Sequence, residues 1–205
     1  MKNMECFTVG HSNYEAQHFI SLLKAQGINC LVDVRSSPYS KFTPQFNKEN
    51  LEAELKASRI LYVYFGNRLG GRYADSDLLY PSGVVDYNKV MQQDNFRAGI
   101  DNVITNIGKG LRISLMCSEK DPLDCHRFLL VSRALSNRGV LVKHILEDGG
   151  LISNEELEKK LLQKYKSEFD QFSLFQANLS SHDAIEEAYQ RRNQEVGFAV
   201  EKAVD

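Results

Sequence analysis

The chain has 205 residues, of which 42% are hydrophobic and 25% are charged, so neither global disorder nor a need for disulfides to complete the core is expected. Its net charge of −2 provides no overall positive field, so nucleic-acid binding would require a local basic patch. The four cysteines are too sparse for a secreted disulfide framework, and no apolar run approaches the length of a membrane span. We therefore expect a cytoplasmic protein with no membrane partner.

Strands and helices are predicted to alternate along the first 150 residues. Short apolar runs predict five strands, over residues 6–9, 30–34, 60–65, 111–116 and 140–146. Amphipathic spacing predicts helices between them, over residues 12–27, 48–57, 88–107 with a break near 94, and 121–137. This alternation indicates an α/β fold: a mostly parallel sheet of about five strands, with helices on both faces and right-handed crossovers.

Capping residues fix the expected helix starts. Ser12 and Glu15 form the pattern of a capping box, and Asn47 can cap the second helix. Asp121, with a proline at the next position, is a favourable start for the fourth.

The character of the chain changes after residue 150. A charged amphipathic helix is predicted over residues 154–166 and a polar helix over residues 183–203. We therefore divide the chain into an α/β domain, residues 1–150, and a helical C-terminal extension, residues 151–205.

Polar residues follow the predicted strands at the points where the strands end. His11 follows the first strand, Asp33 and Arg35 close the second, and Cys117 and Glu119 follow the fourth. Ligands of open parallel sheets bind beyond the carboxyl ends of the strands, so these residues should share one site. The nearby cations and glycines suggest an anionic ligand, unless the cations are solvated or paired within the protein: Arg35, Gly70, Gly71, Arg72, Lys120 and Arg127.

Cys117 is the candidate nucleophile, with a small buried residue at a strand end as the alternative. His126 or His11 would carry the proton, and either could instead be a hydrogen-bonded framework residue. Glu119 or Asp33 would orient these groups.

A metal site is the rival interpretation of the same residues. Its ligands would be Cys117, Cys125 and His126, but their spacing is not a standard ligand pattern, so no metal is assigned and the cofactor is unknown. Residues 125–127 are expected inside a helix, where consecutive side chains point about 100° apart, so they cannot all face one site.

Several motifs together resemble the domain of unknown function 488 family over roughly residues 5–147. They are Thr8–Ser12, Leu31–Arg35, Pro44–Asn47, Leu69–Arg72 and Cys117–Arg127. The resemblance implies this family's fold and a shared polar set, but no reaction. That set is His11, Asp33, Arg35, Cys117, Glu119, Cys125, His126 and Arg127.

A second resemblance lies in the extension. Residues 171–175 are similar to the short peptide with which bacterial proteins dock on the DNA sliding clamp, with Gln171, Leu174 and Phe175 as contact residues. The alternative is an apolar strip that packs the extension onto the domain.

Three hypotheses follow. The leading one is a cysteine-dependent hydrolase or transferase that acts on a phosphate-bearing substrate, such as a nucleotide or nucleic acid. The second is a non-catalytic module that binds an anion or nucleic acid and is linked to the sliding clamp. The third is a metal protein that uses the cysteine and histidine side chains.

Overall fold

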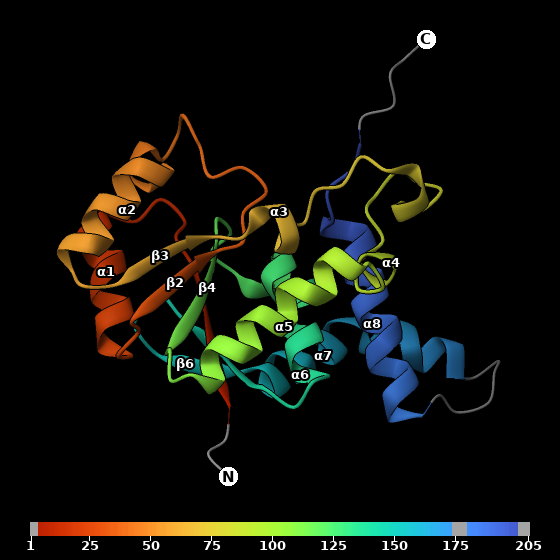
Figure 1. Cartoon of the computed structure of the whole chain (residues 1–205). Helices are drawn as coiled ribbons and strands as arrows, with labels where there is room; N and C mark the ends of the chain where they lie inside the picture. The colour runs from red at the N-terminus through yellow and green to blue at the C-terminus, as the bar shows by residue number, and fades with distance from the viewer. Residues whose placement is uncertain (1–3, 174–179, 201–205) are drawn as a thin grey trace.

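The structure, a computed structural model, describes residues 4–173 and 180–200 (Figure 1). In this part of the chain the strands form one six-stranded sheet in the order β3-β2-β4-β1-β5-β6. All neighbours are parallel except β5 and β6, which pair antiparallel. The strands are β1 (Glu5–Gly10), β2 (Cys30–Asp33), β3 (Leu61–Tyr64), β4 (Ile113–Cys117), β5 (Leu141–Ile145) and β6 (Leu151–Ser153).

Helices cover both faces of the sheet, with α1 and α2 on one face and α5, α6 and α7 on the other (Figure 1). The α-helices are α1 (Ala16–Ala25), α2 (Lys48–Ala57), α3 (Gly66–Leu69), α4 (Tyr87–Val90), α5 (Asp94–Gly108), α6 (Arg133–Ser136), α7 (Asn154–Ser173) and α8 (Ser181–Val196). Short turns of other helix types are η1 (Pro44–Phe46), η2 (Ser76–Leu78), η3 (Pro122–Asp124) and the π-helix η4 (Arg127–Ser132). Among the described residues, no helix has the length and apolar character that crossing a membrane requires.

The predicted α/β fold is confirmed, and the central strands show why their sequences are almost entirely apolar. Neighbouring residues of a strand point to opposite faces. Leu31 therefore packs under α1 and α2, whereas Val32 packs under α5 and the helices that follow β4. The same alternation separates Met116 from Leu115 in β4. Since both faces are buried, the strands lack a polar side.

The parallel strands bring the ends of β1, β2 and β4 to one edge of the sheet. Gly10 pairs with Cys117, and Asp33 lies in register with Met116. Right-handed crossovers place helices on opposite faces when the chain moves in opposite directions across the sheet. The chain first moves from β1 to β2 and β3, and then returns to β4 and β5, which agrees with the two helical layers.

Two expectations about helix starts are wrong. Helix α1 begins at Ala16, with Glu15 at its N-cap position, and Ser12 has a φ of +46° in the preceding turn, where its hydroxyl contacts Asn13. The stretch 121–137 is not one helix: it breaks into η3, an extended Cys125, η4 and α6. Asp121 does cap η3, since its side chain accepts the amide hydrogen of Leu123 at 2.9 Å.

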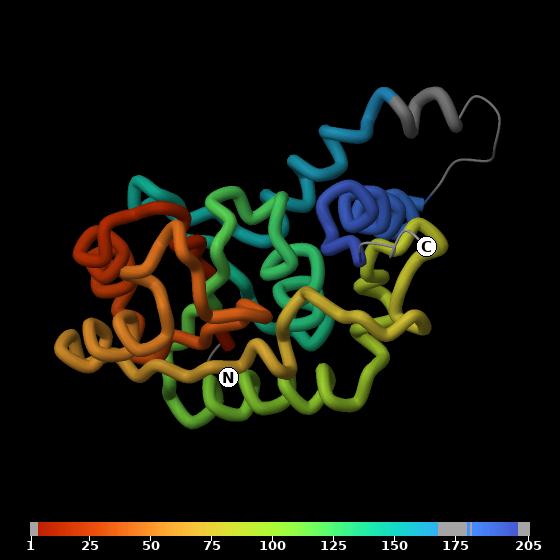
Figure 2. The backbone as a smooth tube through the Cα atoms, turned by 90° about the horizontal axis from the view of Figure 1, so that it is seen from above, coloured from red at the N-terminus to blue at the C-terminus, as the bar shows by residue number. Residues whose placement is uncertain are grey.

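The chain after residue 150 packs against the elements that precede it. Strand β6 completes the sheet beside β5, and α8 packs against α7 and beside α4 (Figure 2). Beyond α8, residues 197–200 form a segment that we call the C-terminal strap. Its Ala199 forms an antiparallel bridge with Val84. The Val85 amide donates to the Phe198 carbonyl at 2.9 Å, which fixes the strap beside the loop that follows η2.

Candidate functional site

A polar cavity of about 170 Å³ lies at the edge of the sheet where β2 and β4 end. Its walls come from the loops that follow β2, β3 and β4, from the chain around α4, and from the end of α8 with the strap. The lining includes two cations and two carboxylates as well as a thiol and an imidazole: Arg35, Arg72, Cys117, Glu119, Asp124 and His126. The predicted location of the site therefore coincides with a cavity.

Four side chains converge at this cavity, and we call Cys117, Glu119, Cys125 and His126 the thiol cluster. One ligand atom from each lies within 4.8 Å of all the others. Both sulfur atoms contact the same Glu119 oxygen, Oε2, at 2.9 Å. The Nδ1 atom of His126 is 3.4 Å from the Cys117 sulfur and 3.9 Å from the Cys125 sulfur.

The break in the predicted helix explains how Cys125 and His126 both reach the cluster. Cys125 has φ −131° and ψ 140°, an extended conformation, and the π-helix begins only at Arg127. The expectation that Cys125 lies inside a helix is therefore wrong, whereas the expectation that residues 125–127 do not all face one site agrees with the structure, because the Arg127 guanidinium bonds to the loop carbonyls of Glu119 and Lys120. Gly71 makes room for the imidazole, because a Cβ atom there would lie 2.8 Å from the Cβ and Cγ atoms of His126.

The electrostatics of the thiol cluster favour ionised Glu119 and make the two thiols unequal. Glu119 is exposed as a residue, but the protein packed against its carboxylate opposes ionisation, and hydrogen bonds from Cys117 and Cys125 outweigh this effect and lower the pKa of Glu119 to about 2. Burial, with Cys125 and Glu119 nearby, raises the pKa of Cys117 well above its ordinary value. For Cys125, burial is outweighed by the hydrogen bond from Cys117 and by the charge of Arg127, which lower its pKa. Cys125 is thus the more acidic thiol, although it is buried and is not among the described residues that line the cavity.

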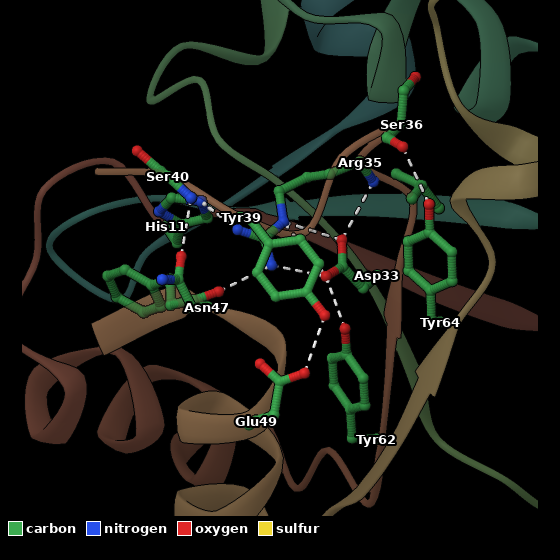
Figure 3. A network of polar contacts seen from close by, with 12 residues as sticks. His11, Asp33, Arg35, Ser36, Tyr39, Ser40, Asn47, Glu49, Tyr62 and Tyr64 are labelled. Atoms are coloured by element: carbon green, nitrogen blue, oxygen red, sulfur yellow. Dashed lines mark hydrogen bonds and ion pairs between the residues drawn. The ribbon is translucent and has the colours of Figure 1, made fainter. Parts of the chain in front are cut away.

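A second polar group, which we call the Asp33 brace, lies beside the cluster and is shown in Figure 3. Arg35 donates from Nη2 to Asp33 at 2.6 Å and to the Phe46 carbonyl at 2.8 Å, and its Nε donates to Asp33 at 2.9 Å. The Tyr62 hydroxyl donates to Asp33 at 2.8 Å. His11 Nε2 is 3.2 Å from Arg35 Nη1, and its ring stacks on Phe46. Burial, and next the charge of Arg35, lowers the pKa of His11 to about 4.

The predicted anion-binding residues separate into three locations. Arg35, Gly71 and Arg72 line the cavity. Arg127 is buried, and its guanidinium donates to the carbonyls of Glu119 and Lys120, so it shapes the loop after β4.

Two more of these residues lie outside the cavity lining. Lys120 is an exposed residue that pairs with Glu147. Gly70 lies so close to the Gly66 carbonyl that no side chain fits there, because a Cβ atom would lie 2.4 Å from the Gly66 oxygen.

Sequence reasoning missed the contribution of the C-terminal strap. Phe198 and Val196 line the cavity, and the Arg72 guanidinium lies 5.2 Å from the centre of the Phe198 ring. No motif marks these residues, because a single bridge to Val84 brings the strap to the cavity. Asp124 is also a lining residue, and it is held by an ion pair with Arg192 of α8.

The predicted clamp-docking peptide falls largely outside the described residues. Helix α7 extends to Ser173 and so includes the backbone of Gln171, while Leu174 and Phe175 are not described. Docking on a sliding clamp stays a prediction.

The fold and the cavity define an α/β domain with a polar site at the carboxyl edge of its parallel strands. The family model for the domain of unknown function DUF488 matches residues 15–134, which is more than half of the chain, so the chain belongs to this family. The predicted membership of this family is thereby confirmed, and of the motifs only Thr8–Ser12 lies outside the matched residues. No curated protein and no solved structure matches the chain.

Proposed function

We propose that this protein is an enzyme that acts on a small substrate with an anionic, phosphate-type group, and that the thiol cluster is its reactive centre. The observation that carries the proposal is the position of Cys117, Glu119 and His126 on the wall of the same cavity as Arg72. Reactive groups and a substrate-binding cation are thus within reach of one bound molecule.

The size of the cavity favours a small substrate or the end group of a larger one. At about 170 Å³ it is smaller than the clefts of about 300–1,000 Å³ that bury drug-sized ligands. Arg72 is exposed, and its guanidinium rests on the Phe198 ring, whereas the Arg35 guanidinium is engaged by Asp33 and Phe46. Arg72 is therefore the cation best placed to bind a phosphate or carboxylate.

Within this proposal, a cysteine-dependent hydrolase or transferase requires that the Cys117 thiol lose its proton. His126 is the candidate base, because its Nδ1 atom lies 3.4 Å from the Cys117 sulfur. The anionic group that the substrate already carries would face Arg72.

The test is a screen of nucleotides, sugar phosphates and short single-stranded nucleic acids with the full chain and two cysteine variants. Cys117→Ala should lower turnover by at least about 100-fold, the loss usual for an essential group. Cys30→Ala is the matched control, because Cys30 is a buried thiol of β2 that lies outside the cluster, and it should retain activity. Equal activity of the two variants would overturn the proposal.

Arg72→Ala tests the substrate class separately. It should raise KM roughly 10-fold or more while changing kcat less, because it removes binding that ground state and transition state share. An unchanged KM for the anionic substrate would show that the anion is not bound in this cavity.

A further inference from the structure

The thiol cluster has the donor geometry of a tetrahedral metal site. Donor atoms that share one zinc ion lie roughly 3.4–3.8 Å apart, given metal–ligand bonds of about 2.0–2.3 Å. The two distances from His126 Nδ1 to sulfur, 3.4 and 3.9 Å, bracket this range closely. Glu119 Oε2 is 2.9 Å from each sulfur, so a small outward movement would bring it to ligand spacing.

The hydrogen bond on the far side of His126 fixes the form of the ring that a metal requires. Nε2 lies 3.0 Å from the carbonyl oxygen of Val34. A carbonyl can only accept, so Nε2 carries the hydrogen, and in the neutral ring that a metal binds Nδ1 presents its lone pair to the two sulfur atoms. Imidazole ligands of metal ions are held in this way by a backbone carbonyl or a carboxylate.

Backbone contacts also prepare the sulfur ligands. The amide of Arg127 donates to the Cys125 sulfur at 3.4 Å, a contact that stabilises a thiolate. Cys117 ends β4, where its pairing with Gly10 of β1 fixes its position. Cys117 is therefore held at the edge of the sheet, and Cys125 is held in the extended backbone between η3 and η4.

We infer that Cys117, Cys125 and His126 bind one zinc-type divalent ion, with Glu119 as an exchangeable fourth ligand that faces the cavity. Two thiolates and an imidazole select a borderline-soft ion over magnesium or calcium. Glu119 is exposed and lines the cavity, so its departure would open a coordination position toward the substrate. The inference rests on the proposed function for the location of the site and for its anionic substrate, and it makes Cys117 and His126 metal ligands in place of nucleophile and base.

The first experiment measures metal by elemental analysis after purification under reducing conditions without chelators, followed by titration of the stripped protein with Co²⁺. We expect one ion per chain and an absorption band from thiolate-to-cobalt charge transfer. Cys117→Ala and Cys125→Ala should each abolish that band, whereas Cys30→Ala should bind the ion like the wild type. A stripped wild type that takes up no Zn²⁺ or Co²⁺, or that oxidises to a Cys117–Cys125 disulfide in the presence of either ion, would overturn the inference.

Two further variants keep the test informative if loss of a thiol prevents folding. Gly71→Ala removes no ligand but displaces the imidazole of His126. It should weaken Co²⁺ binding by about 10–100-fold, the loss usual when a contact that orients a metal ligand is disturbed. Glu119→Gln should keep the thiolate–cobalt band and weaken binding less than His126→Gln. Equal affinities of wild type, Gly71→Ala and His126→Gln for Co²⁺ would exclude His126 as a ligand.

The same samples separate this inference from the proposed function. Turnover of a phosphate-bearing substrate by metal-free protein, sensitive to Cys117→Ala, together with no uptake of Zn²⁺ or Co²⁺, would overturn the metal site and support the thiol enzyme. Stoichiometric zinc without turnover, and without binding of inorganic phosphate that Arg72→Ala weakens, would overturn the proposed function and support the metal site.

Discussion

The Asp33 brace and the thiol cluster lie side by side at one edge of the sheet, yet their contacts differ in kind. In the brace, the Arg35 guanidinium contacts Asp33, Phe46 and His11, and Arg35 and Asp33 are 4% and 0% exposed. In the thiol cluster, two sulfur atoms share a single carboxylate oxygen, and that carboxylate is open to the cavity. A network whose polar groups all bond to one another holds the loops in place. The thiol cluster, in which two thiols share one carboxylate oxygen beside a cavity, can instead bind a ligand.

This difference divides a set of residues that looks uniform in sequence. His11, Asp33 and Arg35 follow strand ends just as Cys117 and Glu119 do, and all five belong to the polar set that the family resemblance implies. Position at a strand end therefore locates a site but does not separate groups that do chemistry from groups that brace it. The first of the three predictions below tests that separation directly, and the other two concern a second closed polar contact and a residue that lines the cavity.

The largest effect is expected from breaking the brace. Asp33→Ala leaves the Arg35 guanidinium buried without its carboxylate, which typically costs about 3–5 kcal/mol of folding free energy. Urea unfolding followed by circular dichroism measures the loss. The control is Asp101→Asn, which removes an exposed ion pair with Arg138 and should leave the unfolding midpoint unchanged. A loss below about 1 kcal/mol for Asp33→Ala would show that the brace is not a structural element.

A smaller, pH-dependent effect is expected from a histidine in another closed polar contact. His144 is buried, with Nδ1 2.8 Å from the Thr8 hydroxyl and Nε2 3.3 Å from Asn154 Oδ1, and its ring meets the edge of Phe128. Burial, and next the charge of Arg127, lowers its pKa to about 3. The unfolded chain binds a proton on this residue below about pH 6.5 and the native protein does not, so stability falls as the pH decreases from 6.5 toward 3.

Each pH unit in that window costs at most about 1.4 kcal/mol for one such histidine. The measurement compares unfolding free energies of wild type and His144→Gln at pH 7 and pH 5. The variant should be less stable at pH 7, and the gap between the two proteins should shrink at pH 5. Parallel pH profiles would mean that His144 is protonated in the native state or does not titrate differently on unfolding.

Much of the fold followed from local pattern. The central strands are short apolar runs buried on both faces, and Leu31, Val32, Leu115 and Met116 fill two different cores as such runs should. The misassigned helix starts have a local cause as well. Ser12 and Glu15 match a capping box, but Ser12 takes a left-handed turn conformation just after β1, and the chain needs three more residues before α1 begins.

The candidate site was harder to predict, because its arrangement depends on tertiary contacts. The prediction of one helix over residues 121–137 could not say which two of residues 125–127 face the site, whereas the extended backbone at Cys125 brings Cys125 and His126 to the cluster. The hydrogen bond from His126 to Val34 and the space left by Gly71 join segments far apart in the sequence. The fourth ligand, Glu119, completes a set whose spacing along the chain resembles no standard metal motif.

The smallest effect is expected from the C-terminal strap, which lies outside the region that the family model matches. Phe198 supports Arg72 through a cation–π contact, and such contacts contribute about 0.5–1 kcal/mol at exposed sites. Phe198→Ala should therefore weaken binding of an anionic substrate by roughly 2–5-fold, which a KM or a calorimetric titration with inorganic phosphate can resolve. The backbone hydrogen bond from Val85 to the Phe198 carbonyl survives the substitution, so the strap should stay in place and the melting temperature should change little.

Phe42→Ala is the matched control for that variant, because Phe42 is 95% exposed and is not among the residues that line the cavity. Equal affinities of the two variants for the anionic substrate would mean that the strap does not contribute to binding and that Arg72 binds the anion without help from Phe198. A loss confined to Phe198→Ala would mean that a segment beyond the matched family region helps to select the substrate. Relatives that share the thiol cluster but differ after α8 should then differ in substrate and not in the chemistry of the cluster.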